Sequence, residues 1–170
     1  MNLYSDSEPI FTLYARIRIE MRLDSSRAIA HGEDCFNVER AMAQKKVLLV
    51  EDDLEIRDIL QDLLEAEGYD VIPASHGRQA LEFLGGTPAS DLPQLVVLDM
   101  MMPLVDGSQV LASMKSDPKL SPIPVVVLSA VARERPAGAA AFLRKPIPLQ
   151  KFFDTVRNFV EAGLPRLATN

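Results

Sequence analysis

Acidic side chains stand directly after two apolar runs of this sequence. Glu51, Asp52 and Asp53 follow KKVLLV, and Asp99 ends QLVVLD. Two carboxylates brought to ~4 Å repel each other by about 4 kcal/mol at an effective dielectric near 20, so such a group is costly without a cation. Mg²⁺ suits these acids, because it prefers hard oxygen ligands and keeps water positions that phosphate can take. The acids therefore predict a magnesium site, provided that the fold brings the two runs together.

Apolar runs of strand length alternate with segments of helical periodicity. The expected strands are residues 45–50, 69–74, 94–99, 122–130 and 141–146, and the expected helices are residues 54–68, 78–84, 108–116 and 149–163. This alternation predicts an α/β fold with a doubly wound five-stranded parallel sheet. The carboxyl ends of parallel strands meet at one edge, where sites form. Ser129, near the end of the fourth strand, and Lys145, in the fifth, are therefore expected beside the acids.

The first expected helix admits two interpretations of its opening residues. Asp52 and Glu55 fit a capping box, although the presence of Asp99 favours a metal role for Asp52. Asp53 is interpreted as a solvated acid of the first turn. The inward face of this helix is expected to hold Ile56, Ile59, Leu60, Leu63 and Leu64.

Composition narrows the class of protein. The chain has 170 residues, of which 48% are hydrophobic and 25% charged, which excludes disorder throughout. A single cysteine excludes a disulfide scaffold and suits a reducing compartment, so we expect a cytoplasmic protein. The net charge of −6 argues against direct nucleic-acid binding. No apolar run approaches the ~20 residues of a membrane span, and membrane insertion is not expected.

Four segments carry a resemblance to a known family. They are VLLVEDD (47–53), VVLDMMMPLVDG (96–107), VVVLSA (125–130) and FLRKP (142–146). In this order, each at a strand end, they resemble the receiver domain of two-component response regulators over residues 45–163. The resemblance implies a flavodoxin-like receiver fold. It also implies a stand-alone response regulator in a phosphorelay, which signals by protein–protein contact to a downstream target that the sequence does not name.

The resemblance implies a role for each residue at the acidic site. Asp99 would accept a phosphoryl group from a sensor histidine kinase or a histidine phosphotransfer protein. Asp52 and Asp99 would bind Mg²⁺ directly, Glu51 would act through water, and the Met101 backbone carbonyl would complete the protein ligands. Lys145 would pair with the oxygens of the transferring group.

The resemblance also implies how the phosphorylated state is read. Ser129 would donate a hydrogen bond to the phosphoryl oxygen, and Phe142 would act as an aromatic switch that turns inward. Lys145-Pro146 matches a peptide bond that is cis in the family, and cis is inexpensive only before proline.

Two departures from the family pattern have consequences. Only twelve residues, AVARERPAGAAA, separate Ser129 from Phe142, so we expect a shortened fourth helix and a reduced output surface. The partner would then contact Phe142 and the final helix, or a loop that contains Arg133 and Arg135. Met101 and Val131 are apolar at positions that flank the phosphoryl group in the family, which predicts slow self-dephosphorylation.

The ends of the chain have no counterpart in a minimal receiver. Residues 1–44 form an N-terminal extension, interpreted either as disordered or partner-docked, or as a gene-model artefact that precedes a native start at Met42. Residues 164–170 form a C-terminal tail that is too short for an output domain.

Two other functions remain as alternatives. The first is a phosphorylation-independent scaffold or interaction protein of the same fold. The second is a Mg²⁺-dependent phosphatase of the haloacid dehalogenase type, which needs a second aspartate two residues after the nucleophile, where this sequence has Met101. The protein is therefore not expected to be an enzyme beyond weak autophosphatase activity.

Overall fold

Strands and helices alternate along the chain, as the sequence predicts. The computed structural model describes residues 45–103, 105–131 and 134–161. The expectations for residues 1–44 and 164–170 lie outside this range. The elements are β1 (Lys46–Val50), α3 (Leu54–Ala66), β2 (Asp70–Ala74), α4 (Gly77–Gly86), the 3₁₀ helix η1 (Ala89–Asp91), β3 (Leu95–Asp99), α5 (Gly107–Ser116), β4 (Val125–Ser129), β5 (Ala141–Arg144) and α6 (Leu149–Glu161).

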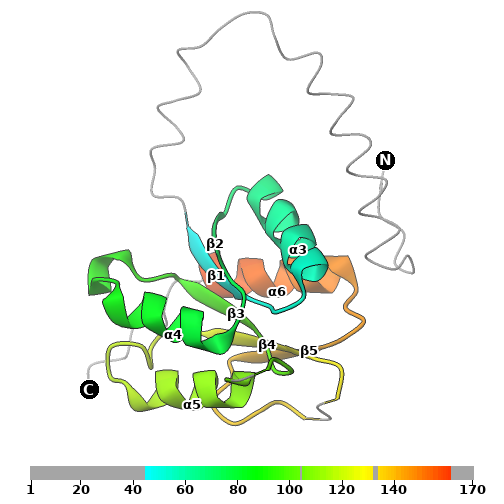
Figure 1. Ribbon diagram of the computed structural model, residues 1–170. Helices are drawn as coiled ribbons and strands as arrows, with labels where there is room; N and C mark the ends of the chain where they lie inside the picture. The colour runs from blue at the N-terminus through cyan, green and yellow to red at the C-terminus, as the bar shows by residue number, and fades with distance from the viewer. Residues whose placement is uncertain (1–44, 104, 132–133, 162–170) are drawn as a thin grey trace, which may run out of the picture.

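The five strands form one parallel sheet in the order β2-β1-β3-β4-β5. Helices α4 and α5 cover one face, and α3 and α6 cover the other (Figure 1). This is the flavodoxin-like order, and it confirms the predicted fold class. The chain reverses its direction of winding between β1 and β3, so the edge beyond their carboxyl ends is open for a site.

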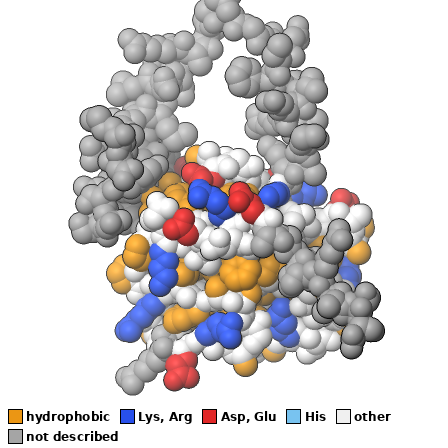
Figure 2. Space-filling model, turned by 180° about the vertical axis from the view of Figure 1, so that it is seen from behind, with side chains coloured by type: hydrophobic (Ala, Val, Ile, Leu, Met, Phe, Trp, Pro, Cys, Tyr) orange, Lys and Arg blue, Asp and Glu red, His pale blue; other side chains and the backbone are white. Residues whose placement is uncertain are grey.

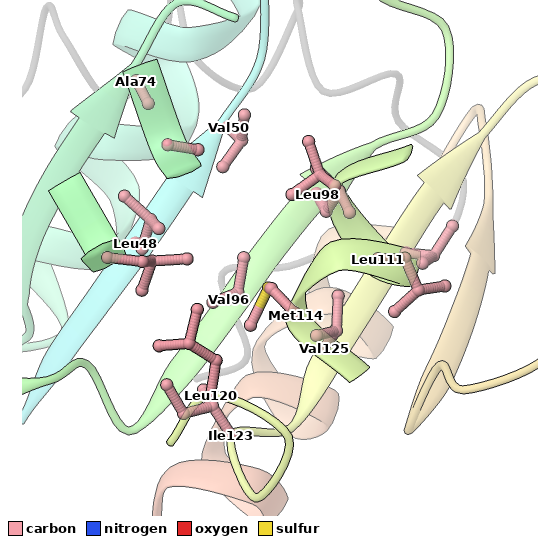
Figure 3. Close-up of a cluster of buried hydrophobic side chains, with 14 of the residues drawn as sticks. Leu48, Val50, Ala74, Val96, Leu98, Leu111, Met114, Leu120, Ile123 and Val125 are labelled. Carbon is pink, nitrogen blue, oxygen red and sulfur yellow. The ribbon is translucent and has the colours of Figure 1, made fainter. Parts of the chain in front are cut away.

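Alternating side chains of the central strands build two cores. Leu48 and Val50 of β1 and Val96 and Leu98 of β3 point to the α4/α5 side, where they belong to one buried cluster and Figure 3 shows Met114 of α5 near Val96. Their neighbours Val47, Leu49, Leu95 and Val97 point to the α3/α6 side. All of these residues are buried, which explains why the strands are apolar throughout rather than alternating.

Helices α3 and α6 lie side by side on the second face of the sheet. Leu63 and Ile59 of α3 pack against Leu149 and Phe153 of α6. Ile56 was expected on the inward face with the other apolar residues of this helix, but its side chain is 37% exposed in the first turn of α3. Seen from behind, the molecule shows charged side chains of both signs around a central apolar area (Figure 2). In the described residues, no helix is long and apolar enough to cross a membrane.

Side-chain caps fix where the helices begin. The Asp53 carboxylate accepts hydrogen bonds from the backbone N–H groups of Glu55 and Ile56, at 2.9 and 3.1 Å. Asp53 is therefore the N-cap of α3, a role that its interpretation as a solvated acid of the first turn did not include. The capping box that was the less favoured alternative to a metal role for Asp52 is not formed. This leaves the Asp52 carboxylate outside the helix cap. Asp106 caps α5 in the same way, through the N–H of Gln109.

The connection between β4 and β5 contains no helix in its described residues, which are 130, 131 and 134–140. The expected shortened fourth helix is replaced there by a turn. Ala139 N–H donates to the Pro136 carbonyl at 3.1 Å, and Gly138 between them has φ of +86°. Pro136 cannot donate a helical hydrogen bond, and a left-handed glycine ends helical geometry. Gly138 lies against the stem of Lys115 of α5.

Helix α5 begins in direct contact with the end of β3. Gly107, its first residue, donates its N–H to the Met100 carbonyl at 3.2 Å. A Cβ at this position would lie 2.3 Å from the Asp99 carbonyl oxygen and 2.7 Å from the Met100 Cα. These contacts are with backbone, so no side-chain rotation can relieve them. Glycine is therefore required where the helix approaches the strand end that carries Asp99.

We expect Gly107→Ala to lower the free energy of unfolding by about 1–3 kcal/mol or more, because overpacking here must displace backbone. Gly85→Ala is the matched control: Gly85 lies in α4 with no atom within 4 Å of the added Cβ. This control should be neutral or stabilise the protein by up to about 1 kcal/mol. Urea unfolding followed by circular dichroism measures both, and equal stabilities would contradict the close-approach argument.

Candidate functional site

Three carboxylates meet at the carboxyl edge of the sheet. Glu51 follows β1 directly, Asp52 is next to it, and Asp99 is the last residue of β3. Each acid offers one carboxylate oxygen, and these three oxygens all lie within 4.8 Å of one another. Glu51 is 1% exposed and Asp99 5% exposed, whereas Asp52 is exposed to solvent. The sheet thus brings together the acids that the sequence predicted, two from the interior and one from the surface.

Lys145 bridges the two buried acids. Its Nζ lies 2.8 Å from Glu51 Oε2 and 2.9 Å from Asp99 Oδ2. The lysine follows β5, and its backbone N–H donates to the Ser129 carbonyl at 2.9 Å, which fixes the start of its side chain. The peptide bond from Lys145 to Pro146 is cis, as the sequence resemblance implied. One ammonium therefore supplies the counter-charge for two buried carboxylates.

Burial sets the protonation of this group. Desolvation raises the pKa of Glu51 from 4.5 to about 7, against the hydrogen bond and the charge of Lys145, which lower it. Burial also lowers the pKa of Lys145, but its hydrogen bonds to Glu51 and Asp99 outweigh this and raise the pKa above its ordinary value. The ammonium stays charged at neutral pH, and Glu51 takes up or releases a proton close to neutrality.

Backbone and hydroxyl groups complete the floor of the site. The Met101 N–H donates to Asp99 Oδ1 at 3.2 Å, so each Asp99 oxygen has a donor. Ser129 is fully buried at the end of β4, and its Oγ accepts from the Val131 N–H at 3.2 Å. Phe142 of β5 pairs in register with Val127 and is half-buried against the α4/α5 core. The structure therefore gathers Glu51, Asp52, Asp99, Ser129 and Lys145 at one edge.

Exposed apolar side chains follow the strand ends that carry the site residues. The large hydrophobic residues that are exposed within the described part of the chain are Leu54, Ile56, Met101 and Val131, at 60%, 37%, 58% and 64%. Each stands within a few residues of a strand end at this edge. We call these four residues the apolar rim. Water-exposed apolar groups around a charged site are typical of a contact surface.

A cavity opens beside the rim. Its volume is about 300 Å³, and its lining is almost entirely apolar: Ile56, Ile59, Leu60, Leu128, Lys145, Pro146 and Ile147. It lies between α3 and the β5–α6 connection. Lys145 lines this cavity and also contacts Glu51 and Asp99, so the cavity adjoins the acidic site.

Sequence reasoning missed Arg57. This half-buried residue of α3 donates from Nη1 to the Glu51 carbonyl oxygen at 2.9 Å. No metal-ligand or catalytic motif calls for an arginine here, and a helical arginine with acidic neighbours reads as a solvated residue. The available signal was its place in the first turns of the helix that follows the acids.

Comparisons with known proteins agree with this geometry. A family model for the response regulator receiver domain matches residues 47–157. The polar-differentiation response regulator DivK of Brucella anthropi is 32% identical over 122 residues, which cover 68% of this chain and 96% of that protein. DivK of Brucella ovis has the same identity and coverage. These relatives are similar to this chain over nearly their whole length.

Solved structures share the fold. The Francisella response regulator 1452 receiver domain has a TM-score of 0.63 at 26% identity, over 70% of this chain and 98% of that one. The response regulator TrrA of Thermotoga maritima, solved in complex with Mg²⁺–BeF, has a TM-score of 0.59 at 26% identity, over 68% of this chain and 99% of that one. With the matched family model, the parallel sheet and the acids at its carboxyl edge, these likenesses show that the chain belongs to the response regulator receiver family.

Proposed function

We propose that this receiver domain accepts a phosphoryl group on Asp99 and works as a stand-alone response regulator in a phosphorelay. The observation that carries the proposal is the setting of Asp99, a buried carboxylate at a strand end. Lys145 Nζ lies 2.9 Å from Asp99 Oδ2. Glu51 and Asp52 each place a carboxylate oxygen within 4.8 Å of an Asp99 oxygen and of each other. Burying charged groups costs free energy that pairing only partly returns, so a cluster of three acids with one lysine indicates a chemical role rather than a contribution to stability.

The donor would be a sensor histidine kinase or a histidine phosphotransfer protein. An Asp99 carboxylate oxygen attacks the phosphorus of the donor's phosphohistidine. A P–O bond forms, the P–N bond breaks, and the imidazole nitrogen keeps the electron pair. Lys145 pairs with the phosphoryl oxygens during transfer. The product is an acyl phosphate on Asp99.

The donor set at this edge fits Mg²⁺, because carboxylate oxygens are hard ligands and Asp52 faces solvent, where water positions stay available. Asp52 and Asp99 would hold the ion directly, Glu51 would act through water, and the Met101 carbonyl would supply a backbone ligand. When bound, the ion neutralises charge on the transferring group. The related structure of TrrA was solved as a complex with Mg²⁺–BeF, which supports this assignment.

Ser129 and Phe142 would report the phosphorylated state. Ser129 Oγ would turn from the Val131 N–H to donate to a phosphoryl oxygen, and Phe142 would turn inward as the serine moves. Phe142 is half-buried in the structure, so an inward turn would bury apolar area that is now partly in water. With no helix in the described residues between β4 and β5, the partner would contact either Phe142 and α6, or the loop that contains Arg133 and Arg135, of which Arg133 lies outside the described residues.

The apolar rim and the adjoining cavity would receive the donor protein. Ile56 and Lys145 both line the cavity, and Lys145 contacts Asp99, so a partner that buries Leu54 and Ile56 would remove apolar surface from water close to the acceptor. A cytoplasmic location belongs to the same proposal, and the single cysteine of the sequence suits a reducing compartment.

Phosphoramidate, a small phosphodonor, tests the acceptor directly. We expect the full chain to gain one phosphoryl group in the presence of Mg²⁺ and none without it, as measured by intact mass. Asp99→Asn should gain none, whereas Asp53→Asn, which changes an acid that caps α3, should be labelled. Failure of the wild type, beside a known receiver that is labelled, would favour a phosphorylation-independent scaffold.

Mg²⁺ binding should depend on pH through Glu51. Its pKa of about 7 lies above the ordinary 4.5, so the Glu51 carboxyl must lose its proton before it presents a full negative charge to the ion. The apparent affinity should therefore be about fivefold weaker at pH 6 than at pH 7 and level off above pH 8.

Calorimetric titration with Mg²⁺ across this range measures the effect. Glu51→Gln, which carries no titrating carboxyl, should bind the ion more weakly and with a flat pH profile. A flat profile for the wild type would contradict the assignment of Glu51. The same raised pKa means that the metal-free protein loses stability as pH rises from about 4.5 to 7. In this range the carboxyl of Glu51 ionises in the unfolded chain while the folded protein still holds the proton.

Self-dephosphorylation should be slow. Met101 and Val131 are exposed beside Asp99 and Ser129, and neither side chain can hydrogen-bond to an attacking water. Met101→Gln and Val131→Gln should each speed the loss of the phosphoryl group roughly tenfold by orienting that water.

Intact mass followed over time, after removal of the phosphodonor, gives the rates. Leu54→Gln, at an equally exposed position of the apolar rim, is the control and should keep the slow rate. A wild type that loses its phosphoryl group as fast as the two variants would contradict the prediction.

A further inference from the structure

Asp52 has fewer side-chain contacts than the other two acids of the site. Its side chain is exposed and makes no hydrogen bond or ion pair within the described part of the chain, whereas Glu51 and Asp99 are both held by Lys145. It also stands outside the cap of α3, because Asp53 fills that role. The direction of the Asp52 carboxylate is therefore set by its backbone alone.

Arg57 holds that backbone on both sides. Its guanidinium Nη1 donates to the Glu51 carbonyl oxygen at 2.9 Å, and its own N–H donates to the Asp53 carbonyl oxygen at 2.9 Å. These carbonyls belong to the residues immediately before and after Asp52. The Glu51 N–H is fixed as well, since it donates to the Ala74 carbonyl of β2 at 3.1 Å. The peptide that carries Asp52 is thus tied to both α3 and the sheet.

We propose that Arg57 is a positioning residue that sets the affinity of the acidic site for Mg²⁺ by fixing the main chain on either side of Asp52. The inference rests on the proposed function. The helical N–H contact survives any substitution at this position, whereas the guanidinium contact depends on the arginine side chain. Without it, the Glu51–Asp52 peptide is free to rotate, and the carboxylate must be ordered when the ion binds.

A simple charge effect has the opposite sign. Arg57 is a cation near a cluster of acids, so it repels a divalent ion, and its removal would strengthen Mg²⁺ binding if charge alone mattered. A positioning role predicts weaker binding after the same change. The direction of the shift therefore distinguishes the two roles.

The experiment compares full-length Arg57→Met, Arg57→Lys and Arg157→Met with the wild type. Lysine keeps the charge on a shorter side chain without the guanidinium fork. Arg157 lies on α6 and pairs with Glu67 just beyond the far end of α3, so its variant removes one positive charge away from the site. Mg²⁺ binding is measured by calorimetry at pH 8, and phosphoramidate labelling is measured against Mg²⁺ concentration.

We expect Arg57→Met to raise the Kd for Mg²⁺ by about tenfold, Arg57→Lys to raise it by a smaller factor, and Arg157→Met to leave it unchanged. The maximal labelling rate at saturating Mg²⁺ should stay close to that of the wild type, which a general loss of structure would not allow. Unchanged or tighter binding by Arg57→Met would overturn the proposal.

If Arg57→Met does not fold, Arg57→Lys decides, and wild-type affinity in that variant would overturn the proposal. Failure of the proposed function has a different signature, because the wild type would then not be labelled. The calorimetric comparison among the variants holds in either case.

Discussion

The contact of one lysine with two buried carboxylates is the constraint on which this structure depends. Lys145 contacts Glu51 and Asp99, which precede it in the sequence by 94 and 46 positions. Unpaired, either acid would have to stay protonated or leave the interior, because an ionised carboxylate is costly in a medium of low dielectric. Only a parallel sheet that places β1, β3 and β5 with their carboxyl ends at one edge supplies this arrangement.

The two hydrophobic cores support the charged groups at the carboxyl edge of the sheet. Strands β1, β3 and β4 are buried on both faces, so the sheet beneath the acids is rigid and excludes water. Helix α5 approaches the end of β3 closely enough that only glycine fits at its first residue. The same dry surroundings that raise the pKa of Glu51 also strengthen its pairing with Lys145. Reactivity and stability at this site therefore have one physical origin.

Much of the fold and of the site could be predicted from the sequence, for reasons that particular residues make clear. Apolar runs such as 95–99 are unmistakable when a strand is buried on both faces, and strand ends of a parallel sheet must converge, so Glu51, Asp99 and Lys145 could be placed together. The cap of α3 could not be assigned to Asp53 from sequence, because Asp52 and Asp53 have the same chemistry and only backbone geometry separates them. The contact of Arg57 with a carbonyl could not be predicted, since any main-chain oxygen is an equal acceptor in sequence.

The connection between β4 and β5 shows which parts of the fold the site needs. The described residues between β4 and β5 form a turn around Gly138, yet Ser129 and Lys145 remain linked by a backbone hydrogen bond at 2.9 Å. Strand pairing alone aligns them, because Ser129 is in register with Arg144. The position of the site residues therefore depends on the sheet and on the turn that carries the acids, and not on a helix in the described residues between β4 and β5. The acidic edge is therefore aligned by strand pairing and not by the connection between β4 and β5.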